Sequence, residues 1–355
     1  MSAIPNLRPA ELSGPRLYSP AHTHFLILHE FPPSDIATRW REFLDRVESP
    51  SHYSAPEYFL EPYWEGKNAF AILAWSGDKI VGVLTGLHTK GKVTCGVPSR
   101  PQICVDKKVD TTETTRILAE GLLREAGRAR LITVYTWDGT PLPGFERHGF
   151  RILKSEGDVV LDLRLGIEAL SKQSNENRRR NIKIAIRNGI EVSEAATAED
   201  IADYWEVYSK WRKTERKKIV HNHTVAMVEK VHEMPGNHRR FLARYKGKLV
   251  AATGLRFYPG GLIEYANNCS LDEYMNLRPN DLLMAKTIEW ACEQGFSKYS
   301  LGGAHPFLRK SGGTVVPIYR YRLDRTFLRR HDLAESISAA ARALRRRLSR
   351  QNLQQ

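Results

Sequence analysis

The chain has 355 residues, of which 41% are hydrophobic and 26% charged, and its formal net charge at pH 7 is +14. These values exclude a chain too short or too polar to fold, and they are typical of a soluble globular protein with room for two domains. The excess of basic residues predicts an anionic partner, such as nucleic acid, a phosphorylated substrate or an acidic membrane surface. A solvated basic surface would give the same charge.

The lengths of the apolar runs and the spacing of the Cys and His residues indicate which classes of protein are not expected. The run at 25–28 is too short for a signal peptide, and no stretch approaches the length of a membrane span, so we expect a cytoplasmic protein. His221 and His223 have no Cys or carboxylate companion nearby, so no metal site is expected. The cysteines form no CxxC pair and suit buried thiols in a reducing compartment. They are Cys95, Cys104, Cys269 and Cys292.

The first half of the chain predicts a mixture of strands and helices. Residues 1–30, rich in Pro and Ser, are expected to be irregular apart from one strand at 24–29. The apolar spacing after Ser34 predicts a helix, and Gly127 closes another. The elements expected up to residue 165 are a helix at 34–47, strands at 69–75, 80–87 and 93–97, a helix at 114–126, and strands at 131–137 and 158–165.

The second half repeats this order, with a hairpin at 241–257, a strand at 262–268, a helix ended by Gly295, and a strand at 296–301. The tripeptide Thr-Gly-Leu at 85–87 recurs at 253–255, which is 168 positions later, and Gly127 matches Gly295 at the same offset. Matching spacing and matching element order predict a duplicated domain. The elements suit an α/β (α+β) fold with mixed, mostly antiparallel sheets covered by helices.

The strand, loop, helix and glycine turn between 262 and 313 organise the second half. Asn280 and Asp281 form a capping pair before the helix, whose free N–H groups and positive dipole end would favour a phosphate or a developing oxyanion. An ordinary capped strand–helix–strand unit explains the same pattern.

Three basic segments are candidates for binding anions. A helix at 171–189 carries Arg180, Lys183 and Arg187 on one face and an apolar stripe on another, although a solvated linker face has the same pattern. The cluster at 211–218 includes Arg216 and follows aromatic residues that either stack bases or anchor the core. The tail from Leu333 predicts an Arg-rich helix. This helix either lies on an anionic membrane or RNA, or docks on the protein with its basic face exposed to solvent.

Several motifs together resemble one family. They are NRRRNIK at 177–183, NGIEV at 188–192, LRPNDLL at 277–283, IEWA at 288–291, YSLGG at 299–303 and FLRKSGG at 307–313. These segments resemble the FemAB-like branch of the GNAT superfamily, whose members are tandem GNAT proteins. The resemblance covers roughly residues 35–330 and is more specific in the second domain, while 145–150 resembles the end of a GNAT core.

The resemblance implies two GNAT-like domains at 31–168 and 169–330, with the active site in the second, between an irregular segment at 1–30 and a basic helix at 331–355. Members include aminoacyl-tRNA-dependent peptidoglycan-bridge transferases and acyltransferases of polysaccharide clusters. Lys310 is the best match for the family's catalytic lysine, with Arg309 as the alternative, because the family's Phe-Lys before Phe-Gly is replaced here. The first domain lacks a Gly-rich loop before Thr114 and is expected to bind no donor.

An amine must attack an activated carbonyl in such a reaction. Lys310 or the backbone N–H groups at 265–267 are expected to stabilise the oxyanion, and holding the two substrates together contributes much of the acceleration. The candidate base is Glu264 or Asp272, with water or the substrate as alternatives. Phosphate-binding candidates are Arg180, Lys183, Arg216 and Arg278, the first three lining one cleft between the domains. The other substrate-binding candidates are Tyr265, Asn280, Gly302, Gly303 and Arg309.

The sequence therefore predicts a cytoplasmic acyl- or aminoacyltransferase that forms an amide on an amino group of a phosphorylated cell-envelope precursor of peptidoglycan or polysaccharide, and peripheral contact with an anionic membrane is the further option. No permanently bound cofactor is expected. The donor is aminoacyl-tRNA or acyl-CoA, and the basic excess favours tRNA. The alternatives are an acetyl-CoA-dependent N-acetyltransferase of a small molecule and a non-catalytic module that binds RNA or phospholipid.

Overall fold

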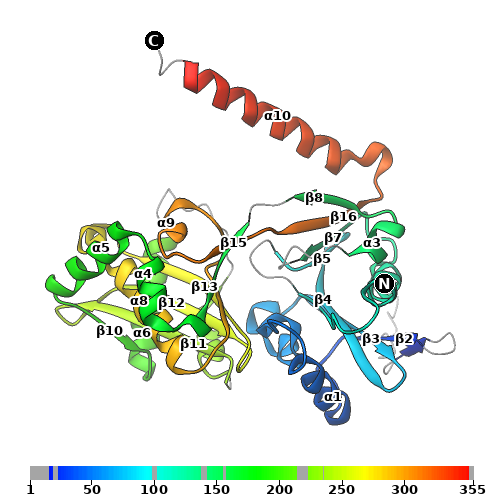
Figure 1. Cartoon of the computed structure of the whole chain (residues 1–355), viewed down its shortest axis with the longest axis horizontal. Helices are drawn as coiled ribbons and strands as arrows, with labels where there is room; N and C mark the ends of the chain where they lie inside the picture. The colour runs from blue at the N-terminus through cyan, green and yellow to red at the C-terminus, as the bar shows by residue number, and fades with distance from the viewer. Residues whose placement is uncertain are drawn as a thin grey trace, which may run out of the picture.

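The computed structural model describes residues 16–18, 23–97, 102–136, 142–154, 157–213, 223–234 and 236–351. These residues form two sheets that lie side by side, each covered by helices (Figure 1). Most neighbouring strands are antiparallel, so the expected α/β fold with mixed, mostly antiparallel sheets covered by helices is confirmed.

The first sheet has nine strands within the described residues, in the order β1-β2-β3-β4-β5-β7-β16-β8, with β6 paired to β4. Its strands are β1 (Arg16–Tyr18), β2 (Thr23–Leu28), β3 (Asn68–Ser76), β4 (Lys79–Thr89), β5 (Lys92–Cys95), β6 (Ile103–Val105), β7 (Leu131–Thr136), β8 (Arg151–Lys154) and β16 (Tyr319–Asp324). Helices α1 (Ser34–Leu44) and α2 (Thr111–Ala126) cover opposite faces of this sheet, and α3 (Pro143–Arg147) packs on α2.

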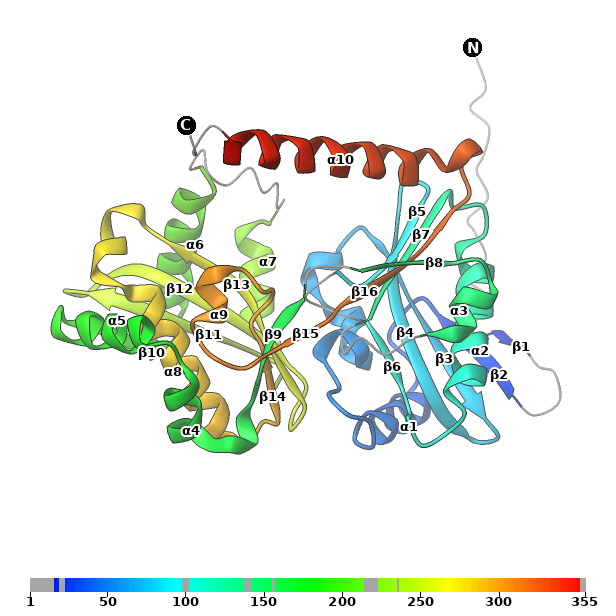
Figure 2. The same cartoon turned by 45° about the horizontal axis from the view of Figure 1, so that its top comes forward.

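The second sheet has seven strands in the described part of the chain, in the order β10-β11-β12-β13-β14-β9-β15. They are β9 (Asp158–Asp162), β10 (Ile190–Glu194), β11 (His238–Tyr245), β12 (Lys248–Phe257), β13 (Leu262–Ser270), β14 (Lys298–Ser300) and β15 (Thr314–Val316). One face carries α4 (Gly166–Gln173), α5 (Glu176–Arg187), α8 (Pro279–Glu293) and α9 (Pro306–Arg309), and the other carries α6 (Ala198–Arg212) and α7 (Val225–His232). The last helix, α10 (Arg330–Gln351), extends away from the end of β16 in Figure 1 and runs above both sheets in the view of Figure 2.

The two sheets exchange strands. β9 comes from the first half of the chain but lies between β14 and β15 of the second sheet, whereas β16 comes from the end of the chain and lies between β7 and β8 of the first. The linear boundaries expected at 168 and 330 therefore do not coincide with sheet membership at these two strands. Spacing along a sequence shows where a strand is but not which sheet accepts it.

The two sheets keep the predicted correspondence. The repeated Thr-Gly-Leu lies in β4 and in β12, the second strand of a hairpin in each sheet. A Cβ at Gly86 would lie 2.4 Å from the Phe70 ring, and one at Gly254 would lie 2.8 Å from the Asn267 side chain, so each glycine lets a neighbouring side chain pack closely on the strand. Gly127 and Gly295 follow α2 and α8 with positive φ.

A buried ion pair joins the two halves of the molecule. Glu61, at the start of a short 3-10 helix (Pro62–Trp64), accepts hydrogen bonds from Nε and Nη2 of Arg256 in β12, each at 2.9 Å. His52 Nε2 lies 3.1 Å from the same carboxylate, and all three side chains are buried. The relative position of the two sheets is thus held by a charged contact inside the protein.

Candidate active site

The candidate site is the place where β13 and β14 separate. The two strands pair in parallel only between 262–264 and 298–300, after which β13 continues to Ser270 while the other chain turns away. The register of β12 and β13 shifts at the same point, with Leu255 opposite Tyr265 and Gly254 opposite Asn267, so Ala266 is the extra residue of a β-bulge. A bulge beside an opening in a sheet re-aims the backbone and is common at active sites.

A glycine turn closes the end of β14 at this opening. Gly302 has φ +80°, and a Cβ there would lie 3.2 Å from the carbonyl oxygen of Tyr265, which fits only glycine comfortably. The backbone N–H of Gly303 donates to Asp158 Oδ1 at 2.6 Å, and Ser300 Oγ donates to the other oxygen of that carboxylate. Asp158 belongs to β9, so the exchanged strand fixes the glycine turn. The sequence analysis did not identify it, because nothing local links it to residue 303.

A buried cation and a carboxylate meet beside this opening. Arg178 in α5 is 2% exposed, and its Nη1 lies 3.0 Å from Asp281 Oδ1 in the first turn of α8. Its Nη2 donates to the Phe307 carbonyl at 2.8 Å and to Ser311 Oγ at 3.0 Å, and the guanidinium lies over the Phe307 ring. Arg178 thereby ties α5 and α8 to the segment around α9. Sequence reasoning missed it because it stands in a run of three arginines, of which Arg180 was chosen.

Asp281 bears on the expectation that the N-terminus of α8 binds a phosphate or an oxyanion. Burial raises the pKa of Asp281, while Arg178, a hydrogen bond from Asn181, Arg278 and Lys310 act in the opposite direction. Cations therefore surround this carboxylate, and it stands where the helix N-terminus would otherwise attract a phosphate. The Asp281 carboxylate, paired with Arg178, thus occupies the anion position at this helix N-terminus.

Lys310 lies at the C-cap of α9 and is partly buried. Its carbonyl oxygen accepts a hydrogen bond from Asn175 N at 2.8 Å, which anchors the backbone, and the charge of its ammonium acts against the burial that raises the pKa of Asp281. Arg309, the alternative, is exposed, and its Nε donates to the Ala304 carbonyl at 2.6 Å. Of the two cations, Lys310 is the one the fold brings to the cluster around Asp281.

Tyr265 and Glu264 point to opposite faces of β13. Tyr265 packs on the side of α8, where burial raises its pKa to about 12 against the effects of a hydrogen bond with Thr253 and the charge of Arg178. Glu264 is buried on the other face, in register with Arg256 and Ser300. Glu264 therefore lies on the face of β13 opposite to Tyr265, whereas α9, which has Lys310 at its C-cap, packs on the same side as Tyr265.

The remaining predicted binding residues fall into two groups. Asn280 is buried and structural in character: its amide donates to Ser270 Oγ and accepts from Asn268 Nδ2. Arg278 is exposed at the N-cap of α8, with a left-handed φ of 65° that places its side chain at the helix start. Asp272, the alternative base, lies exposed in a 3-10 helix (Asp272–Leu277).

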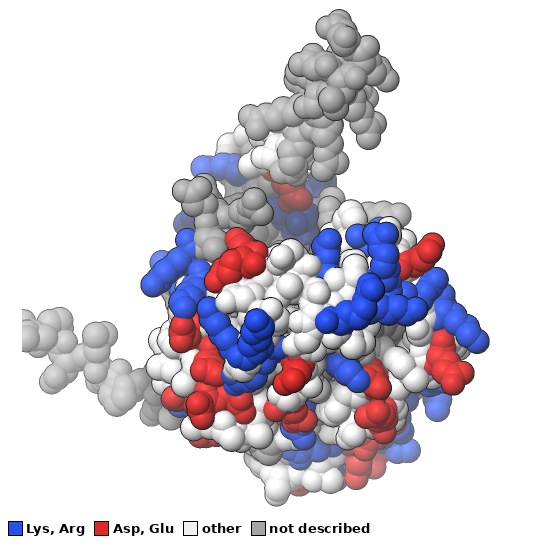
Figure 3. Space-filling model, turned by 90° about the vertical axis from the view of Figure 1, so that its left-hand side faces the viewer, with Lys and Arg blue, Asp and Glu red and all other residues white. Residues whose placement is uncertain are grey.

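The expected cleft between the domains is not where the basic helix lies. Arg180 and Lys183 are exposed on α5, at the end of the second domain farthest from the first sheet (Figures 1 and 2). Lys and Arg side chains are numerous on this face (Figure 3). The prediction was wrong because a segment central in the sequence was taken to be central in space, whereas β9 and α4 carry the chain across the second sheet first. Arg216 lies outside the described residues.

No group of His, Cys, Asp or Glu suited to hold a metal ion occurs among the described residues. In the same part of the chain, no helix is long and apolar enough to cross a membrane.

Comparison with known proteins agrees with this geometry. Residues 172–309 match the family model described as an acetyltransferase (GNAT) domain. None of the curated proteins matches the chain.

Three solved structures with low sequence identity share the fold. FemX is 13% identical with a TM-score of 0.62 and covers 81% of this chain and 96% of its own. The C-terminal domain of a putative lysylphosphatidylglycerol synthetase from Agrobacterium fabrum is 12% identical, with a TM-score of 0.58 over 87% and 96%. A tandem GNAT protein from the clavulanic acid biosynthesis pathway is 12% identical, with a TM-score of 0.56 over 86% and 99%.

Residues 172–309 thus match a GNAT acetyltransferase domain, and the chain shares the fold of FemX and of a tandem GNAT protein. The shared fold with FemX is consistent with the resemblance to FemAB-like proteins that the sequence motifs indicate.

Proposed function

We propose that the chain is an aminoacyltransferase that forms an amide on an amino group of a phosphorylated cell-envelope precursor, with aminoacyl-tRNA as donor. The observation that carries this proposal is the opening between β13 and β14, which has Lys310 and the Tyr265 side on one face and Glu264 on the other. Two substrates that meet at this opening would be held close together, which accelerates a bimolecular transfer.

The chemistry follows from these two faces. The acceptor's amine attacks the ester carbonyl of the donor, a C–N bond forms, and the C–O bond to the tRNA breaks. Lys310 stabilises the negative charge that develops on the carbonyl oxygen. Glu264 accepts the proton that the amine loses, and the departing ribose oxygen takes up a proton in turn.

The start of α8 favours tRNA over acyl-CoA as the donor. A compact pyrophosphate site needs several free N–H groups at a helix N-terminus, but Pro279 has none and Asp281 places a carboxylate in the first turn. Asp272 and Glu273 add exposed negative charge just before the helix. A tRNA instead requires a broad cationic surface, which exposed Arg180, Lys183 and Arg187 on α5 offer.

The acceptor class rests on the relatives. FemX and a lysylphosphatidylglycerol synthetase share the fold, and the second name itself describes a lysyl group joined to a phosphorylated lipid. Arg278 and Arg309, both exposed beside the opening, are the cations proposed to hold the acceptor's phosphates. Because the donor is a tRNA, the proposed location is the cytoplasm.

A second candidate is an acetyl-CoA-dependent N-acetyltransferase. It is favoured by the description of the matched family model and by the tandem GNAT relative, whose structure is titled as lacking AcCoA. The two candidates differ in the donor and in the charge that the donor carries.

Titration of labelled tRNA at two salt concentrations, with acetyl-CoA measured in parallel by calorimetry, separates them. We expect the affinity for tRNA to fall steeply as the salt concentration rises, because binding releases the counterions of several phosphates. We expect no saturable binding of CoA. Lys183→Ala should lower the salt slope by about one, whereas Lys79→Ala, an exposed lysine of the first sheet, should not. Saturable CoA binding without tRNA binding at low salt would reject the aminoacyl donor and leave the N-acetyltransferase.

A further inference from the structure

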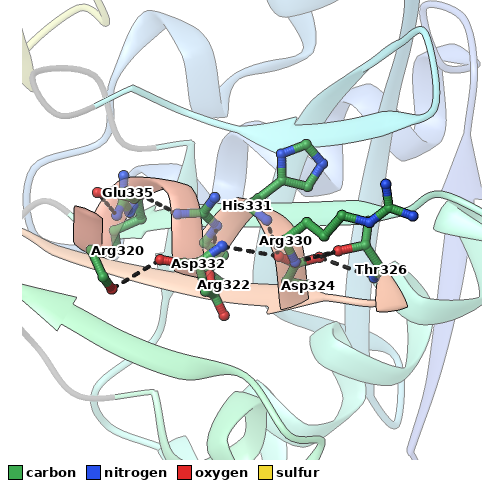
Figure 4. Close-up of polar contacts among 9 residues, drawn as sticks. Arg320, Arg322, Asp324, Thr326, Arg330, His331, Asp332 and Glu335 are labelled. Atoms are coloured by element: carbon green, nitrogen blue, oxygen red, sulfur yellow. Dashed lines mark hydrogen bonds and ion pairs between the residues drawn. The ribbon is translucent and has the colours of Figure 1, made fainter. Parts of the chain in front are cut away.

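The C-terminal helix is attached to the first sheet through its polar side. Asp324, the last residue of β16, accepts hydrogen bonds from the backbone N–H groups of His331 and Asp332 at 2.9 and 3.1 Å, which caps the first turn of α10 (Figure 4). Thr326 Oγ1 donates to the same carboxylate at 2.6 Å and accepts from Arg330 N at 2.8 Å. The start of the helix is therefore fixed in direction relative to the sheet.

Both acidic residues of α10 are used in this attachment. Glu335 pairs with Arg320 at 2.6 Å and also with Arg322, and Asp332 lies 3.2 Å from Arg322 Nε (Figure 4). The arginines belong to β16, so the acidic side of the helix faces the sheet. Negative charge is thereby removed from the outward face of the helix.

The apolar side of the helix consequently faces away from the protein. Leu333 is 54% exposed and Ile337 is 62% exposed, although an amphipathic helix of a globular protein normally buries such residues. The turn before the helix continues this surface, because Phe327 is 77% exposed and Leu328 is 72% exposed. Leu328 has a φ of 54°, a left-handed conformation that is costly for a residue of this type.

Basic residues accompany this apolar surface. Arg325, Arg329 and Arg330 are exposed around the Phe327–Leu328 turn. Further along α10 the sequence contains Arg342, Arg345, Arg346, Arg347 and Arg350 and no acidic residue after Glu335.

We propose that the Phe327–Leu328 turn and the outward side of α10 dock on a lipid bilayer surface rich in anionic phospholipid. Apolar side chains entering the headgroup boundary beside arginines that meet lipid phosphates are the two components of interfacial helix binding. Four large exposed apolar side chains favour a lipid over RNA, which would use the cations alone. The concentration of arginine disfavours a second copy of this helix, since the like charges would repel. The inference is independent of the reaction catalysed.

Flotation of the full chain with vesicles tests the proposal. Wild-type protein should bind vesicles that contain phosphatidylglycerol and should bind pure phosphatidylcholine vesicles at least tenfold more weakly. Phe327→Ser/Leu328→Ser and Leu333→Ser/Ile337→Ser should each lower binding roughly tenfold or more, since each removes two apolar side chains from the contact. Because these positions are exposed, circular dichroism and thermal unfolding should be unchanged.

Ile167→Ser/Ile186→Ser is the matched control, because Ile167 in α4 and Ile186 in α5 are 41% and 58% exposed on the second domain. It should retain binding within about twofold of wild type. Absence of wild-type binding to phosphatidylglycerol vesicles overturns the proposal, as does an equal loss in the control. Two other results also overturn it: the α10 variants weaken tRNA binding but not vesicle binding, or light scattering shows a wild-type dimer that they dissolve.

Discussion

The two sheets differ in how a strand before the main helix pairs with the strand after it. In the first sheet, the whole of β5 pairs in parallel with β7, from 92–95 to 131–134. In the second, only the beginning of β13 pairs with β14, and β13 has a bulge at Ala266 just beyond the paired residues. A duplicated unit has thus kept its element order while one copy closed its sheet and the other opened it.

The helices that follow β5 and β13, which are α2 and α8, also differ in how their N-termini are capped. Asp110 caps α2 by accepting from Thr112 N at 2.9 Å and Glu113 N at 3.2 Å, so those N–H groups are already used. The N-cap of α8 is Arg278, which makes no side-chain cap, and its first turn holds Asp281 paired with Arg178. In the first sheet the following helix is capped by a side chain, whereas in the second sheet charged side chains gather at the start of the helix beside the opening.

The largest expected effect concerns the contact that holds the two copies together. Glu61→Gln leaves the Arg256 guanidinium buried without a carboxylate, so we expect the free energy of unfolding to fall by about 3–5 kcal/mol. Glu48→Gln is the control: Glu48 also joins the two halves through Lys298, but this carboxylate is exposed and its loss should cost under about 1 kcal/mol. Urea unfolding at pH 7 measures both, and equal losses would contradict the assigned role of burial.

The same pair fixes the sign of a pH dependence. Burial acts to raise the pKa of Glu61, but Arg256 and His52 outweigh burial and lower it. A carboxyl whose pKa is depressed by folding contributes stability above its unfolded pKa and loses that contribution as the pH falls through its folded pKa. The difference between wild type and Glu61→Gln should therefore shrink below about pH 4.

The next effect tests whether only the open copy is catalytic. Lys310→Ala should lower turnover by about a hundredfold, the size of the loss of one oxyanion donor, and should leave the fold intact. His148 occupies the corresponding C-cap after α3 in the first domain, so His148→Ala is the matched control and should stay within about twofold of wild type. Single-turnover transfer rates decide, and wild-type rates for Lys310→Ala would remove that residue from the site.

The smallest effect tests the closed copy. Asp110→Ala removes the α2 cap and should lower stability by about 1 kcal/mol without changing turnover. Asp35→Ala alters a carboxylate in the first turn of α1, which has no side-chain cap, and should cost only about 0.3–1 kcal/mol. Thermal unfolding compares the variants, and a drop in turnover for Asp110→Ala would show that the first domain takes part in the reaction.

The sequence was sufficient for features that repeat or that depend on local pattern. Apolar spacing and closing glycines gave the two copies, and the motif around Lys310 selected a residue that lies beside Asp281. It was insufficient for contacts between distant segments. Arg178 reaches residues more than a hundred positions away, and Asp158 fixes a turn that belongs to another half of the chain, so neither has a local signal.

The exposed face of α5 shows a second feature that the sequence was insufficient to predict, which is the direction in which a helix face points. Charge on a helix face is visible in the sequence, but the direction in which that face points depends on the path of the chain. Arg180 and Lys183 were therefore recognised as basic and misplaced in space.

The exchange of β9 and β16 has a consequence for how the protein forms. During synthesis, the first sheet lacks the strand between β7 and β8 until residues 319–324 leave the ribosome, so β7 waits for a partner nearly two hundred residues away. Closing a contact over such a separation is slow, and the incomplete edges expose strands to aggregation in the meantime. A fragment ending at residue 168 would carry β9 without its sheet and lack β16, and we expect it to be recovered mainly as insoluble protein. The chain thus becomes two folded halves only after nearly all of it exists.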